Sequence, residues 1–151
     1  MDLKTRVKKG LTAGLVAGLA MDATEDIAYY FFRQPRIRSF DWVSITFTRK
    51  RPFTTREISL ARAGHLVFTA ALGGIFALIV PRAGKENLAA KGWLWGVVVW
   101  CVSQTVTSAL KLPLLSRPGV ASRVQHLMLA SVYGLVLGAG LASNQKNPSW
   151  W

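Results

Sequence analysis

The only two histidines of the chain, His65 and His126, stand in matching surroundings. Each follows an arginine by three residues, in Arg62-Ala-Gly-His65-Leu and in Arg123-Val-Gln-His126-Leu. On a helix, residues three apart lie on one face, so each histidine would share a face with its arginine. Both segments also lead into apolar runs of membrane-spanning length. The two copies therefore predict a polar site inside a helical membrane domain.

Three carboxylates stand on a separate segment, with Asp22 and Asp26 four residues apart and Glu25 beside them. Such closely spaced carboxylates would not all ionise without cations between them, so we expect Arg62 and Arg123 as partners. Charged groups in hydrocarbon are costly, which places them in the interior of the bundle. We expect one polar cluster in one half of the bilayer, formed by Asp22, Glu25, Asp26, Arg62, His65, Gln104, Arg123 and His126.

The elements that would position these groups are long apolar helices. The chain has 151 residues and a hydrophobic share of 51%, which favours a single membrane domain over residues 1–151. Crossing the hydrocarbon takes roughly 20 helical residues. We predict an all-α membrane protein with four transmembrane helices, at about 5–32, 57–80, 91–112 and 120–143.

The first and third predicted helices begin alike, with Lys9-Gly10 and Gly14 matching Lys91-Gly92 and Gly96. Together with the repeated histidine segments, this predicts two tandem helical hairpins related by a pseudo-two-fold axis along the membrane normal. The second and fourth helices would then run parallel, with their histidines at the same depth. Small residues expected to let helix backbones approach are Gly10, Gly14, Gly18, Gly73, Gly74, Gly134 and Gly138.

A formal net charge of +12 raises the question of nucleic acid. No nucleic-acid motif is present, and the basic residues lie in loops beside the predicted spans, so a nucleic-acid partner is not expected. In the predicted loop 33–56, arginines alternate with aromatic residues, which is typical of a segment lying in the membrane interface against anionic lipid headgroups.

Three roles for the polar cluster stay open. It would lock the helices together or hold a partner, which favours a homo-oligomer or a subunit of a larger membrane complex. It would alternatively form a proton or cation path through Asp22, Glu25, Asp26 and the histidine pair. As a second alternative, His65 and His126 would supply the two axial ligands of a b-type haem.

An enzyme is not expected. Ser59, Ser103 and Ser131 lack the context of a catalytic triad, and the histidine spacing does not match a metalloprotease helix. The single Cys101 excludes a CxxC or cysteine-based zinc site. We therefore expect no metal and, apart from the haem alternative, no cofactor.

Several short segments resemble a known family. They are Gly-His65-Leu-Val-Phe, Lys-Gly-Trp-Leu-Trp-Gly96, Leu112-Pro113-Leu-Leu and Gln-His126-Leu, with Gln34-Pro35-Arg36 after the first helix. Together they resemble the YagU-like small membrane proteins. The resemblance implies a four-span, multi-pass protein of the bacterial inner membrane. The resulting expectation is a small, non-enzymatic membrane subunit or organiser with an intramembrane polar cluster.

Overall fold

The computed structural model describes residues 2–32, 37–80, 86–112, 115 and 119–143. Its elements are five helices, namely α1 (Leu3–Phe32), α2 (Ser39–Thr48), α3 (Thr55–Ile79), α4 (Leu88–Ala109) and α5 (Val120–Ser143). The predicted all-α class is confirmed. α3 and α5 are long and apolar enough to cross a membrane, whereas charges in α1 and polar residues in α4 lower the hydropathy of those two helices.

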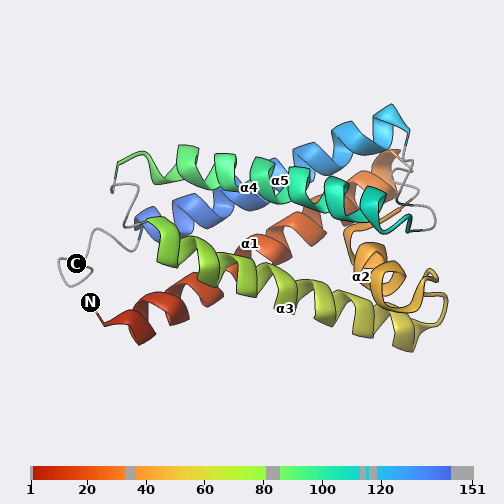
Figure 1. The fold of residues 1–151 in the computed structure, drawn as a ribbon, viewed down its shortest axis with the longest axis horizontal. Coiled ribbons are helices and arrows are strands. Elements are labelled where there is room, and N and C mark those ends of the chain that lie inside the picture. The colour runs from red at the N-terminus through yellow and green to blue at the C-terminus, as the bar shows by residue number, and fades with distance from the viewer. Residues whose placement is uncertain (1, 33–36, 81–85, 113–114, 116–118, 144–151) are drawn as a thin grey trace.

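The four long helices form an elongated bundle (Figure 1). α1 packs against α3 and α5, and α4 packs against α5. α1 and α4 end at the same end of the bundle where α3 and α5 begin, so α3 and α5 run parallel (Figure 1). This arrangement places the charged end of α1 beside the histidine-bearing turns of α3 and α5.

Glycines bring the paired backbones into close contact. A side chain at Gly10 of α1 would collide with the Gly73 carbonyl of α3, and one at Gly92 of α4 would collide with the Gly134 carbonyl of α5. Only glycine permits such an approach, because a Cβ atom would occupy the space of the neighbouring backbone. The two helix pairs thus use glycines from the matched segments of the sequence, while the internal repeat itself stays a prediction.

The predicted loop 33–56 contains a helix, α2, which is a correction to the sequence reading. Its Ile45 side chain is fully buried and packs with Leu112 and Leu115. The Asp41 carboxylate accepts a hydrogen bond from the Arg38 backbone N–H at 2.9 Å, which fixes the start of the helix. The aromatic residues that indicated an interfacial loop therefore belong in part to a short helix docked on the bundle.

Candidate functional site

The centre of the candidate site is a carboxylate–imidazole pair between α1 and α3. Asp22 Oδ1 lies 3.0 Å from His65 Nδ1, and the two residues are 8% and 5% exposed. Neither atom makes a hydrogen bond with any residue that the structure describes. Among the described residues the two groups are thus each other's partner, in a buried carboxylate–imidazole ion pair.

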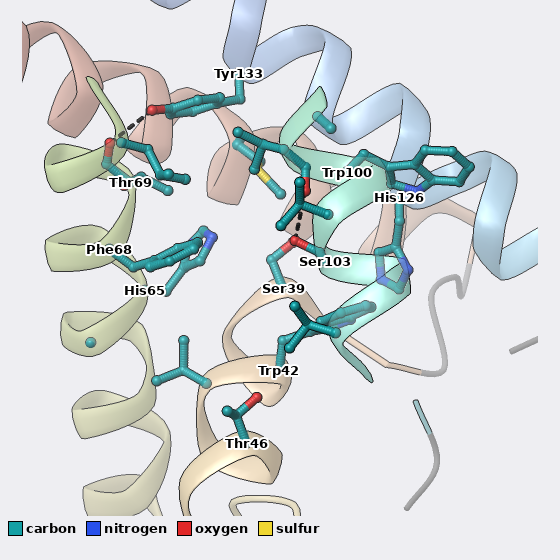
Figure 2. A pocket seen from close by; sticks show the side chains of 18 of the residues that line it. Ser39, Trp42, Thr46, His65, Phe68, Thr69, Trp100, Ser103, His126 and Tyr133 are labelled. Atoms are coloured by element: carbon teal, nitrogen blue, oxygen red, sulfur yellow. Dashed lines mark hydrogen bonds between the residues drawn. The ribbon is translucent and has the colours of Figure 1, made fainter. Parts of the chain in front are cut away.

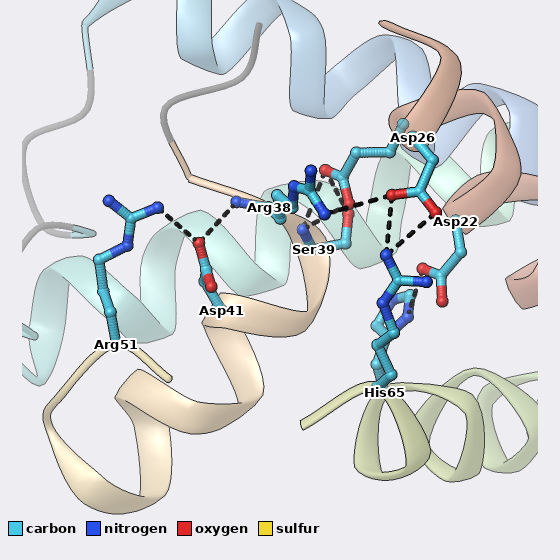
Figure 3. A network of polar contacts seen from close by, with 9 residues as sticks. Asp22, Asp26, Arg38, Ser39, Asp41, Arg51 and His65 are labelled. Carbon is cyan, nitrogen blue, oxygen red and sulfur yellow. Dashed lines mark hydrogen bonds and ion pairs between the residues drawn. The ribbon is translucent and has the colours of Figure 1, made fainter. Parts of the chain in front are cut away.

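A half-buried ion-pair network adjoins this centre (Figure 3). Arg62 Nη2 of α3 donates to both oxygens of Asp26 on α1, at 2.8 and 3.0 Å. Arg38, which precedes α2, reaches the same carboxylate at 3.3 Å. Because Asp26 receives cations from two segments, it ties α1, α3 and the start of α2 together beside the Asp22–His65 pair.

Glu25 performs a different task from its two acidic neighbours. Its side chain is 1% exposed, and both of its oxygens accept the Ser39 backbone N–H, at 2.8 and 2.9 Å. The Ser39 hydroxyl donates to the same carboxylate at 3.1 Å. Ser39 opens α2, so Glu25 binds the positive end of that helix and seats it against α1.

The chemistry of the Asp22–His65 pair suits a divalent metal, since imidazole nitrogen and carboxylate oxygen are the ligand atoms that zinc and similar ions take. A catalytic zinc generally has three protein ligands. Over the described part of the chain, no group of three such side chains is already gathered. Glu25 interacts electrostatically with both Asp22 and His65, but both of its oxygens are already bound to Ser39.

A cavity of about 750 Å³ opens next to His65, between α3 and α4 (Figure 2). His65 and Phe68 line it from α3, and Ser103 lines it from α4. α2 contributes Trp42, and the Tyr133 hydroxyl of α5 donates to the Thr69 carbonyl of α3 at 2.8 Å within the wall. The walls are largely apolar, so the site joins a polar cluster to a hydrophobic chamber.

The second histidine lies on this cavity rather than in the carboxylate network. His126 Nε2 lies 3.3 Å from the Ile37 carbonyl oxygen, and Trp42 packs edge-on against the ring at 5.5 Å between centroids. His126 Nδ1 has no hydrogen-bond partner among the residues described. Gln104 of α4 also lines the cavity, and its Nε2 is buried without a partner.

The structure brings some of the expected groups together and separates others. Asp22 contacts His65, and Asp26 contacts Arg62. Arg123, expected as a second partner for the carboxylates, is exposed on α5 and takes part in none of the ion pairs found in the described ranges. The two histidines have different surroundings, since His65 pairs with Asp22 whereas His126 lies against the Ile37 carbonyl and Trp42, and the paired axial ligation of a haem is not carried further.

Sequence reasoning missed two contributors to the site. Ser39 and Trp42 both lie in the segment read as an interfacial loop. The Arg38-Ser39-Phe40-Asp41 sequence carried the missing signal, because an acidic residue three positions after a helix cap is typical of a helix start.

A protein-family model described as "PrsW family intramembrane metalloprotease" aligns with residues 3–116. Curated proteins and solved structures give no match. The resemblance to YagU-like proteins is therefore wrong, and so is the expectation of a non-enzymatic subunit or organiser, with its ion-path alternative. The sequence reading searched for two histidines on one helix, whereas the buried carboxylate–imidazole pair joins α1 and α3.

Proposed function

This chain belongs to the PrsW family of intramembrane metalloproteases, and from that premise we propose that it hydrolyses peptide bonds of membrane-embedded polypeptides. The reaction would take place where α1, α2 and α3 meet. The observation that carries the proposal is the buried Asp22–His65 ion pair, with Asp22 Oδ1 and His65 Nδ1 3.0 Å apart. His65 also lines a cavity large enough for part of a polypeptide.

We assign the metal to Asp22 and His65, and leave Glu25 out of the ligand set because both of its oxygens accept the Ser39 N–H. When bound, a divalent ion supplies Lewis-acid chemistry that polarises a peptide carbonyl and activates a water molecule.

The other polar residues would position this centre. The Asp26–Arg62 pair holds α1 against α3, which keeps Asp22 and His65 in register. Glu25 holds the start of α2, and α2 covers one side of the cavity. An apolar enclosure limits water to the polar edge and strengthens the electrostatic interactions within it.

The membrane setting is also part of the proposal. The family is membrane-embedded, and α3 and α5 have the length and hydropathy of membrane spans. We propose that α1 and α4 also cross the membrane, giving a four-span protein of the bacterial inner membrane. We further propose that the basic residues around α2 contact anionic headgroups, and that the chain forms homo-oligomers or joins a larger complex.

The test is cleavage of a fluorogenic single-span peptide by the purified chain in lipid nanodiscs. We expect turnover by the wild type, inhibition by a metal chelator, and a loss of at least about 100-fold in Asp22→Asn and His65→Gln. Arg123→Gln is the matched control, since this arginine is exposed and lies outside the network. Unchanged turnover in both site variants would reject the assignment, and absence of turnover in the wild type would reject the function for this peptide class.

A further inference from the structure

The segment that joins α2 to α3 presents two aromatic rings to the outside of the protein. Phe47, near the end of α2, and Phe53, just before α3, are each 83% exposed. This is the highest exposure of any large hydrophobic residue in the described ranges. Single exposed apolar residues are common, but two phenyl rings on one short connection suit an apolar partner outside the chain.

Basic residues flank the two rings. Arg49, Lys50 and Arg56 are exposed, and they take part in none of the ion pairs found among the residues that the structure describes. We call these three residues, together with Phe47 and Phe53, the interface patch. It combines positive charge with apolar surface.

The carboxylates near the interface patch already have partners. Asp41 accepts a hydrogen bond from Arg51 at 2.9 Å (Figure 3). Glu57 Oε2 accepts the backbone N–H groups of Phe53 and Thr54, at 2.9 and 3.0 Å. The positive charge of the interface patch is therefore available to an anion from outside the chain.

Hydrogen bonds fix the turn that carries the patch. Arg49 has a left-handed backbone with a φ of 58°, and its N–H donates to the Ile45 carbonyl at 2.9 Å. The Ser44 and Thr48 hydroxyls both donate to the Lys50 carbonyl, at 3.0 and 3.2 Å. A turn that is already ordered loses little conformational entropy when it binds a partner.

The position of the patch identifies the partner. It directly precedes α3, a candidate membrane span, and α2 lies at the end of the bundle where α3 begins (Figure 1). The patch is thus at the depth of lipid headgroups, where basic residues meet phosphates and aromatic rings enter the boundary with the acyl chains. A free phosphate ion or an acidic polypeptide would match the charge and leave the rings uncovered.

The same end of α2 borders the cavity. Val43, Thr46 and Phe47 line it, so a shift of this end of α2 would change the cavity wall. The opposite end of α2 is already tied to α1, because Ser39 donates to Glu25. A contact at the interface patch would hold the second end.

We propose that the interface patch binds the headgroups of anionic phospholipids, and that this contact holds α2 in place as a wall of the cavity. Arg49, Lys50 and Arg56 bind phosphate oxygens, while the two phenyl rings enter the headgroup–acyl boundary. The lipid composition of the membrane thereby regulates cleavage. This regulatory role rests on the proposed protease function, whereas the lipid contact itself does not.

The test places the full chain in nanodiscs of phosphatidylcholine alone or of an equal mixture with phosphatidylglycerol. We expect the anionic lipid to slow hydrogen exchange over Ser39–Thr48 at least about threefold and to leave α5 unchanged. Peptide cleavage should rise at least about threefold in the same nanodiscs, and high salt should reduce both responses.

Paired charge removals provide the residue-level test. The double variant Arg49→Gln/Lys50→Gln should lose both responses to phosphatidylglycerol and keep the cleavage rate measured in phosphatidylcholine. Lys4→Gln/Lys8→Gln is the matched control, because it removes the same charge from exposed residues at the opposite end of the bundle. It should retain the full response. Circular dichroism and thermal unfolding establish that each variant is folded.

Equal exchange of α2 in the two lipids would overturn the proposal, as would a wild-type response in the Arg49→Gln/Lys50→Gln variant. Equal protection by inorganic phosphate or by a polyglutamate peptide, added to phosphatidylcholine nanodiscs, would overturn the assignment to lipid. Protection of α2 with the same cleavage rate in both lipids would overturn the regulatory role. Protection without any cleavage would reject the protease function alone, whereas cleavage without a response to lipid would reject this inference alone.

Discussion

Asp22 Oδ1 of α1 and His65 Nδ1 of α3 face each other at 3.0 Å in a buried position, and neither makes a hydrogen bond with the described residues. The two residues lie 43 positions apart in the sequence, so the contact depends on the packing of α1 against α3. That packing relies on glycines, since Gly14 and Gly73 place the two backbones in contact. The glycines that let α1 approach α3 therefore also determine how close Asp22 comes to His65.

The two Arg-x-x-His segments should respond differently to the same substitution. Arg62→Gln removes the cation that binds both Asp26 oxygens, whereas Arg123→Gln changes an exposed side chain. We expect Arg62→Gln to lower the free energy of unfolding by about 1 kcal/mol, because solvent weakens this partly exposed ion pair, and Arg123→Gln to have little effect. Thermal unfolding in detergent measures both. Equal effects would show that the network does not hold α1 to α3.

Glu25→Ala should loosen α2. In the wild type, the buried Ser39 N–H donates to the Glu25 carboxylate. The substitution removes this acceptor, which should lower the free energy of unfolding by about 1–3 kcal/mol. Hydrogen exchange should therefore accelerate over Ser39–Thr48 and remain unchanged in α5. Glu25→Gln, which keeps an acceptor oxygen, should recover most of the protection. Faster exchange throughout the protein would instead indicate a general loss of fold.

The close approach of α4 and α5 predicts a contrast between two glycines of α5. A Cβ atom at Gly134 would collide with the Gly92 carbonyl, whereas one at Gly140 would lie 3.7 Å from the Ala13 Cβ, an ordinary contact. Gly134→Ala should cost about 1–3 kcal/mol through overpacking, and Gly140→Ala should be nearly neutral or slightly stabilising. Unfolding midpoints of the two variants, measured side by side, decide this. Similar midpoints would mean that the helices separate easily.

Much of the helical organisation could be predicted from the sequence, because apolar length and the positions of proline and glycine mark helix boundaries. α3 begins at Thr55 and α5 at Val120, close to the predicted starts. The contacts of Asp22 and Asp26 also agree with the predicted convergence of acids with Arg62 and His65. The directions of the helices are enough to bring these residues to the same end of the bundle. Those directions can be predicted from the order of the apolar segments in the sequence.

What the sequence could not convey was the exact partner of each group. Glu25 binds a backbone N–H rather than a guanidinium, and a backbone group leaves no signature in the side-chain pattern. α5 is rotated about its axis so that His126 packs against Trp42 and Arg123 faces outward. The spacing of residues along the sequence does not determine this rotation. The enzyme class was missed because the two residues that we propose as metal ligands lie on separate helices, so no local motif contains them.

The most direct test of the account measures metal binding by the full chain together with cleavage. Purified protein, stripped with a chelator, is titrated with Zn²⁺, and the same samples are assayed for peptide hydrolysis. We predict one tightly bound equivalent that restores turnover, with affinity reduced by at least about tenfold in both Asp22→Asn and His65→Gln and unchanged in Arg123→Gln. Wild-type metal affinity and turnover in the two site variants would contradict the assignment of the Asp22–His65 pair as the catalytic centre.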